Sequence, residues 1–240
     1  MLREAFVHYR NNFSTAMAFA ILLVFILPFS LIANINIESG TSALDYSLLV
    51  DNPTNMVIAT AVALLFILFY SVFTSLIIFA VRKDMVKIKI HYYLTQKIEK
   101  FSLKIFVFYT ALFLVLFVIN ALLIQLGAPA LAGTAISFLI TILLLFVPQS
   151  IVIDELSLRS AIHSNFDFMK NNSAVIVYVL LAGITILAVI NVIEYALDYL
   201  FFIGRFITPV LVLVFAVPYI ECIKSIAYMK KYELVKAKQA

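Results

Sequence analysis

Six apolar runs of about 20 residues constrain this chain more than any other feature of its sequence. A run of that length crosses the hydrocarbon core of a bilayer as one α-helix, whereas helices of soluble proteins alternate apolar and polar faces. The composition agrees, because 65% of the 240 residues are hydrophobic and only 12% are charged. We therefore expect an all-α membrane protein with a single membrane domain over residues 1–240. The expected spans are residues 14–35, 56–81, 105–126, 131–153, 174–197 and 206–222.

Lysine and arginine are distributed very unevenly between the loops on the two sides of the expected membrane domain. Short cytoplasmic loops retain these residues, whereas loops on the opposite side lack them. The N-terminal segment, the loops at 82–104 and 155–172 and the C-terminal tail together hold 16 of the 17 basic residues, and the other side holds only Arg205. We therefore expect a multi-pass protein of the cell membrane with both termini in the cytoplasm.

Two of the cytoplasmic loops, 82–104 and 155–172, are expected to form amphipathic helices that lie on the membrane surface. In the second, Leu158, Ile162, Phe166 and Met169 recur at helical spacing, and the charged residues fall four apart on another face. The first carries seven basic residues, and each one close to an anionic surface contributes about 1 kcal/mol of attraction. We expect contact with anionic lipid headgroups, although a cytosolic protein partner would use the same side chains. These basic residues are Arg82, Lys83, Lys87, Lys89, Lys97, Lys100 and Lys104.

Two short segments that precede odd-numbered spans resemble each other. Residues 6–12 read F-V-H-Y-R-N-N and residues 166–172 read F-D-F-M-K-N-N, and the segment before the third span, 97–104, is also basic and amphipathic. The pattern is consistent with a unit of one short interfacial helix and one helical hairpin, used three times. The alternative is a chance match that reflects the shared demands of the membrane interface.

The expected spans contain no Asp, Glu or His near mid-membrane, where ion-coupled transporters usually keep one. Glu194 and Glu221 are expected at the outer and inner headgroup levels. Pro148 and Pro218 each bend the inner third of an even-numbered span, because proline frees a backbone carbonyl. Such bends open an inner cavity or let the helices splay into the interface. The candidate cavity residues are Pro148, Gln149, Ser150, Asn191, Pro218 and Glu221, and packing between helices is the alternative role of the polar ones.

Motifs of catalysis and cofactor binding are not found in the sequence. It contains no H-E-x-x-H zinc motif, no G-x-S-x-G nucleophile elbow and no glycine-rich phosphate loop. Cys222 is the only cysteine, so no intramolecular disulfide can form, and no Cys/His spacing resembles a metal site. The chain also has no soluble part that could present a basic face to nucleic acid. We therefore expect neither an enzyme nor a cofactor, metal or nucleic-acid partner.

Residues 147–172 read V-P-Q-S-I-V-I-D-E-L-S-L-R-S-A-I-H-S-N-F-D-F-M-K-N-N. This segment resembles a superfamily of prokaryotic six-helix proteins that includes the YciC-like proteins and the membrane domains fused to glycerophosphodiesterases. In that superfamily a proline and an acidic residue end one span, and an alanine, an aromatic residue and a basic residue lead into the next span. The residues that match this pattern here are Pro148, Glu155, Ala161, Phe166 and Lys170. The family usually has tryptophan where this chain has Phe166. The resemblance implies a multipass membrane fold and brings no catalytic residue.

The sequence thus favours a non-enzymatic membrane protein that acts in membrane organisation or as the membrane subunit of an assembly. The alternative is a transporter or facilitator for a small or lipid-like substrate. In both hypotheses the lipid bilayer is the main partner, and a membrane or cytosolic protein is a further one.

Overall fold

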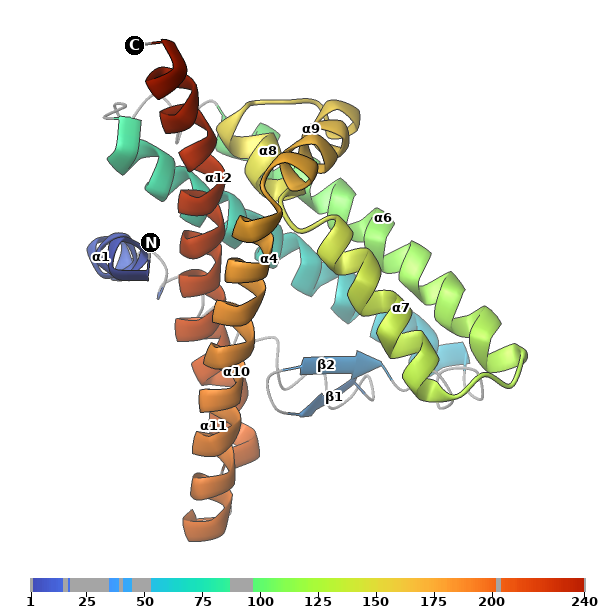
Figure 1. Ribbon diagram of the computed structural model, residues 1–240. Helices are drawn as coiled ribbons and strands as arrows, with labels where there is room; N and C mark the ends of the chain where they lie inside the picture. Colours follow the sequence, from blue (N-terminus) through green and yellow to red (C-terminus); the bar gives the residue numbers. More distant parts are fainter. Residues whose placement is uncertain are drawn as a thin grey trace.

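The computed structural model describes residues 2–14, 17, 35–38, 41–44, 53–86, 97–201 and 204–239 (Figure 1). These residues form helices and one small β-hairpin. The expected first span, 14–35, lies outside the described residues except at positions 14, 17 and 35. The helices are α1 (Leu2–Asn11), α4 (Pro53–Val86), α6 (Ile98–Gln125), α7 (Ala130–Leu143), α8 (Val147–Ile153), α9 (Leu158–Asn171), α10 (Ser173–Phe201), α11 (Gly204–Leu211), the π-helical turn η1 (Val212–Ala216) and α12 (Val217–Gln239).

Five segments of the described part are long and apolar enough to cross a membrane, which is what the second to sixth expected spans require. By length and composition the chain is therefore a helical membrane protein. The segments are Thr60–Lys83, Ile98–Gln125, Leu131–Ile153, Ser173–Leu200 and Ile207–Lys230.

The loop expected at 36–55 contains a β-hairpin that the sequence analysis did not predict. Strand β1 (Ile35–Glu38) pairs antiparallel with β2 (Thr41–Leu44), with Ile35 opposite Leu44 and Glu38 opposite Thr41. Each strand has only four residues, and alternation over so short a stretch is too weak a signal to separate a strand from a loop.

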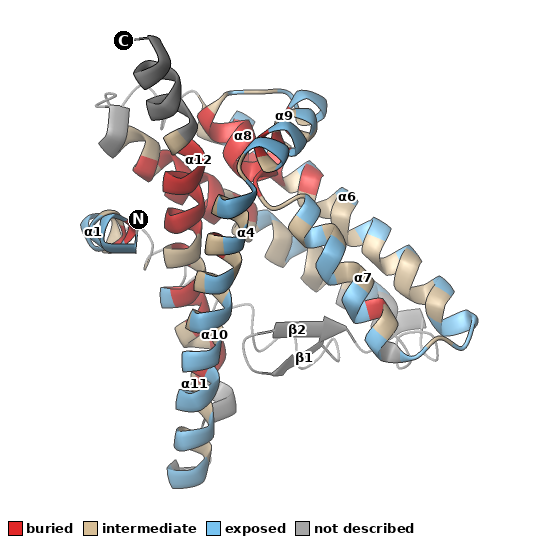
Figure 2. Ribbon diagram, in the orientation of Figure 1, coloured by how far each residue is buried: buried red, intermediate tan, exposed pale blue. Residues whose placement is uncertain are grey.

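The membrane-length helices divide into an inner and an outer group. The most apolar 18 residues of each span differ in how many of them are buried within the protein. The buried share is 67% in Ile207–Lys230 and 44% in Thr60–Lys83, but only 6% in α6 and 11% in α10. The buried residues gather where α4, α8 and α12 meet, whereas α6 and α10 consist mainly of intermediate and exposed residues (Figure 2). We call α4, α8 and α12 the inner helices and α6 and α10 the outer helices. The outer helices therefore expose apolar side chains, which is what a lipid-facing surface requires.

The fourth span is broken between α7 and α8. Pro148 has no N–H and its ring crowds the carbonyl four residues earlier, so the helix stops at Leu143 and restarts at Val147. The buried Asn165 of α9 closes the break: its Oδ1 accepts the Phe146 N–H at 2.9 Å, and its Nδ2 donates to the Leu143 carbonyl at 2.7 Å. One side chain therefore satisfies backbone groups on both sides of the break.

The sixth span changes its winding just before Pro218. The turn η1 is π-helical, and Val214 within it lies four residues before the proline, where an N–H would otherwise bond its carbonyl. The Tyr9 hydroxyl of α1 donates to this Val214 carbonyl at 3.1 Å. Burial raises the pKa of Tyr9 to about 12, so the phenol keeps its proton near neutral pH. The helix is thus interrupted at Pro148 and changes its winding at Pro218, and at each place a side chain of another helix bonds a backbone carbonyl.

The amphipathic segments differ from the prediction in two respects. Helix α9 buries Ala161, Asn165 and Phe168 against the inner helices. Most of the predicted membrane-facing stripe also packs partly against this core, at Leu158, Ile162 and Met169, and only Phe166 of the stripe is exposed, at 44%. Packing on the protein therefore sets the orientation of α9. The segment 97–104 is not a separate surface helix, because α6 begins at Ile98 and continues through it to Gln125.

The two segments that resemble each other have a matching local structure. Asn12 at the end of α1 donates its Nδ2 to the His8 carbonyl at 3.0 Å, and Asn172 at the end of α9 donates to the Phe168 carbonyl at 3.0 Å. Each helix also covers the break of a proline-containing span. These contacts support a repeated unit, which remains a hypothesis because the third unit lacks a separate surface helix.

Candidate functional site

A cluster of polar side chains lies in the middle of the inner helices, and we call it the polar centre. On α4 and α12 its members recur at positions i, i+3 and i+4, so each set lies on one face of its helix. All members are buried. They are Ser71, Thr74 and Ser75 of α4, Gln149 and Ser150 of α8, and Glu221, Lys224 and Ser225 of α12.

Glu221 holds the charged part of the polar centre together. Its Oε1 accepts a hydrogen bond from Lys224 Nζ at 2.7 Å, and its Oε2 accepts one from Gln149 Nε2 at 2.8 Å. The side chains of Glu221 and Lys224 are 5% and 7% exposed. Removing such charges from water costs several kcal/mol each, and the short bonds between them offset part of this cost. The ion pair lies within α12, and the hydrogen bond from Gln149 ties α8 to it.

Two tyrosines, one on α4 and one on α6, interact with the same carboxylate. The rings of Tyr70 and Tyr109 stand 5.4 Å apart, and Glu221 interacts electrostatically with both phenol groups. The Thr74 hydroxyl lies beside both phenols. Carboxylate, amide and hydroxyl groups from four helices therefore face one region of the bundle.

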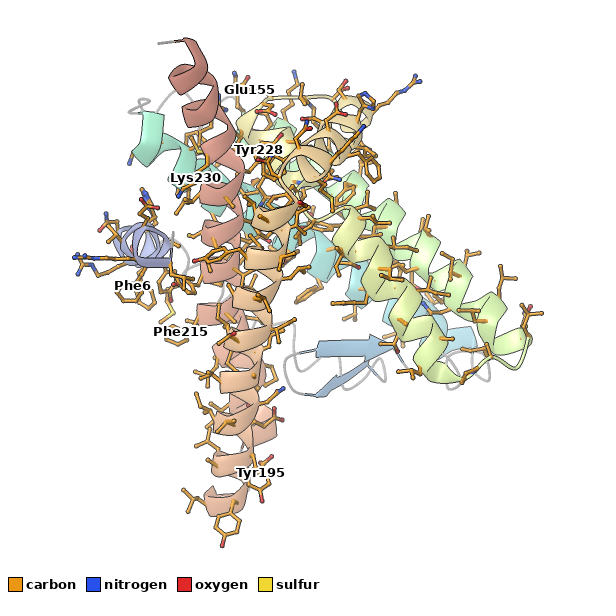
Figure 3. The ribbon with its side chains drawn as sticks, in the orientation of Figure 1. Phe6, Glu155, Tyr195, Phe215, Tyr228 and Lys230 are labelled. Atoms are coloured by element: carbon orange, nitrogen blue, oxygen red, sulfur yellow. The ribbon has the colours of Figure 1, made fainter. Side chains whose placement is uncertain are left out.

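A second network surrounds Tyr228 of α12, on the side of α8 and α9 (Figure 3). The Tyr228 hydroxyl donates to Asp154 Oδ2 at 2.6 Å and accepts from Ser150 Oγ at 2.8 Å. Ser164 Oγ lies 3.1 Å from the same hydroxyl and donates to it, since the tyrosine proton is directed to Asp154. The Tyr228 hydroxyl thus uses its donor and both lone pairs, and it fixes α9 to the inner helices.

The connection from α8 to α9 is held by basic residues of other helices. Arg82 donates to the Val152 carbonyl at 2.8 Å and pairs with Glu155 at 3.1 Å, and Lys97 pairs with the other oxygen of Glu155. Lys104 donates to the Leu156 carbonyl at 2.8 Å. Glu155 has a φ of +58°, a left-handed conformation that side chains with a Cβ rarely adopt.

The structure brings together some of the predicted cavity residues and separates one from them. Gln149 and Glu221 are in direct contact, Ser150 follows Gln149 on α8, and Pro148 and Pro218 are buried on the inner helices. Asn191 is exposed on α10 and takes no part, because α10 turns that face away from the inner helices. Its inclusion was wrong.

Glu221 lies further from the end of the sixth span than the sequence analysis assumed. Within the candidate span Ile207–Lys230, Glu221 lies 14 residues after the first residue and 9 before the last, about 21 Å and 14 Å along a helix. The sixth span was expected to end at 222, but α12 continues to Gln239, so Glu221 does not stand at the end of its helix. Glu194 is half-buried on α10, seven residues before the end of that helix at Phe201.

Three of the basic residues that were assigned to lipid headgroups have contacts within the protein. Arg82 and Lys97 bind Glu155, and Lys104 binds a backbone carbonyl. Lys100 is exposed and Lys83 half-buried, while Lys87 and Lys89 lie outside the described residues. For the first three, fixing the α8–α9 connection is therefore the role that their contacts support.

The sequence analysis missed Lys224, Tyr228 and Thr74. Lys224 was counted as a charge of the C-terminal tail, although Glu221, Lys224, Ser225 and Tyr228 recur on one helix face. That spacing was the available signal. In the described part of the chain no three His, Cys, Asp or Glu side chains come together as a metal site would require.

The fold and the polar centre together define the class: a helical membrane protein that encloses an ion pair between its inner helices. No protein-family model, curated protein or solved structure matches the chain. The resemblance of residues 147–172 to the YciC-like proteins therefore stays a prediction.

Proposed function

We propose that this protein is a facilitator or carrier for a small solute, with the polar centre as its binding site. The observation that carries the proposal is the buried ion pair of Glu221 and Lys224, bonded to Gln149 between the inner helices. Ionisable groups enclosed within spans are costly, and in membrane proteins they usually mark a substrate or ion pathway.

This proposal replaces the expectation of a purely organising role. That expectation depended on spans without a central ionisable group, and Glu221 and Lys224 remove its basis. Replacing a buried ion pair with apolar residues of similar size is often neutral or stabilising. A protein that only needed to pack its helices would gain nothing by keeping the pair, whereas a solute site needs polar groups in the bundle.

The test compares the wild type with a variant whose ion pair is apolar, Glu221→Leu with Lys224→Met. Asn191→Leu serves as a matched control, because Asn191 is polar, membrane-embedded and exposed. Each protein is purified in mild detergent and analysed by native mass spectrometry for retained molecules. Wild type and control should retain the same small molecule or lipid, and the apolar variant should lose it. A stoichiometric protein partner with no retained small molecule would instead support the membrane-subunit hypothesis.

We further propose six spans in the cell membrane, with both termini in the cytoplasm. The support is the 16 to 1 division of Lys and Arg between alternate loops. Cys222 is buried and unsuitable as a topology label, so the test uses Cys222→Ser with one new cysteine at either Leu126 or Ser160, both exposed. An impermeant maleimide should label L126C in intact cells and S160C only after permeabilisation. The reverse pattern would invert the proposed orientation.

A further inference from the structure

Two buried polar atoms of the polar centre have no hydrogen-bond partner among the described residues: Oγ1 of Thr74 and Oε1 of Gln149. The Thr74 hydroxyl can rotate, whereas the Gln149 oxygen is fixed by the bond that its own amide group makes to Glu221. The Gln149 side chain is fully buried, with 0% exposure. A buried amide oxygen without a partner costs about 1–3 kcal/mol, so a protein retains one where something else supplies the missing bond.

The neighbouring carboxylate determines which end of the amide remains available. Glu221 can only accept hydrogen bonds, so Gln149 must turn its Nε2 towards Glu221 Oε2, and the two atoms are 2.8 Å apart. The Oε1 atom therefore points away from Glu221 as a pure acceptor. A ligand at this atom must bring an N–H or O–H donor.

The charge balance of the polar centre determines the charge of that ligand. Glu221 and Lys224 neutralise each other at 2.7 Å, so the site carries no net charge. A cation or anion would add an unpaired charge in a medium of low dielectric constant, which costs several kcal/mol. A neutral ligand avoids this cost.

Further hydroxyl groups come from Tyr70 and Tyr109, which interact electrostatically with Glu221, and from Thr74 beside them. The hydroxyls of Tyr70, Tyr109 and Thr74 can each donate and accept. Together with the amide oxygen they suit a molecule with more than one hydroxyl or amide group. Apolar ligands would leave these groups unpaired.

We propose that the polar centre binds a small neutral solute of the polyol or amide class, with one of its N–H or O–H donors on Gln149 Oε1. This inference rests on the proposed carrier function and adds the chemical class of the substrate. Glycerol and urea are the simplest probes of that class.

The experiment measures solute entry into vesicles of phosphatidylcholine and phosphatidylglycerol that contain the purified protein. Stopped-flow light scattering follows the uptake of glycerol and of urea. Uptake should be at least several-fold faster than in empty vesicles, and Gln149→Met should reduce it to the empty-vesicle rate. This variant keeps the length of the side chain and removes its polar atoms. Asn191→Met, the matched control at an exposed position, should leave uptake unchanged.

The possible results separate this inference from the carrier proposal. Flux of methylammonium or rubidium without flux of glycerol or urea would overturn the neutral ligand class and leave the carrier proposal standing. Equal glycerol and urea uptake by wild type and Q149M would overturn the role of Gln149. No flux of any probe, with no retained small molecule, would overturn both. Where Q149M fails to fold, Gln149→Asn withdraws the oxygen by one methylene group and should slow uptake.

Discussion

Replacing Asn165 with leucine should destabilise the protein through the break in its fourth span. Leucine has a similar size, so the change removes the two hydrogen bonds with little loss of volume. The Phe146 N–H would then be buried without a partner, which costs about 1–3 kcal/mol, and the lost bond to the Leu143 carbonyl costs about 0.5–1.5 kcal/mol. The sum is about 1.5–4.5 kcal/mol. In a chain of this size each kcal/mol lowers the melting temperature by about 2–4 °C, so we expect a decrease of about 3–18 °C.

The single cysteine supplies the assay. Cys222 is 3% exposed in the folded protein and reacts with a fluorogenic maleimide only when the bundle opens. Heating the detergent-solubilised protein with this dye gives a melting curve. Asn191→Leu makes the same chemical change at an exposed position and should melt within about 2 °C of the wild type. If N165L and N191L melted together, the account of Asn165 as the residue that closes the break would be refuted.

Two further changes probe contacts that hold the helix connections. Tyr9→Phe removes the donor to the Val214 carbonyl and should lower the free energy of unfolding by about 1–2 kcal/mol in the same thiol assay. The control Tyr195→Phe, at a side chain that is 76% exposed, should not change it measurably. Equal melting curves for the two variants would argue against the Tyr9 bond. Glu155 has a φ of +58°, which is unfavourable for a residue with a Cβ atom. Its glycine and alanine variants both lose the ion pair with Arg82, but only alanine keeps the Cβ. The glycine variant should therefore be more stable than the alanine variant by about 1 kcal/mol. A more stable alanine variant would contradict the left-handed conformation.

Much of the candidate site could be predicted only in outline. Pro148 and Pro218 were recognised as bends because proline acts on its own helix, whatever surrounds it. The pairing of Gln149 with Glu221 could not be predicted, since the two residues are 72 positions apart and meet only when α8 packs on α12. Asn191 was included for its polarity, and nothing local shows that its face of α10 is exposed. Lys224 looked like a tail charge because the end of the sixth span was placed two residues before it.

The spans and the division of basic residues are properties of short windows, because length, hydropathy and charge act on each segment separately in a bilayer. They required no knowledge of which helices touch. Which face of each helix is buried is a different kind of property, because lipid and protein interior are both apolar and hydropathy does not distinguish them. The position of Glu221 shows the consequence: its charge is tolerable within the bundle only because Lys224 and Gln149 contact it there. The packing of the inner helices therefore made a polar centre from residues that the sequence placed at an interface.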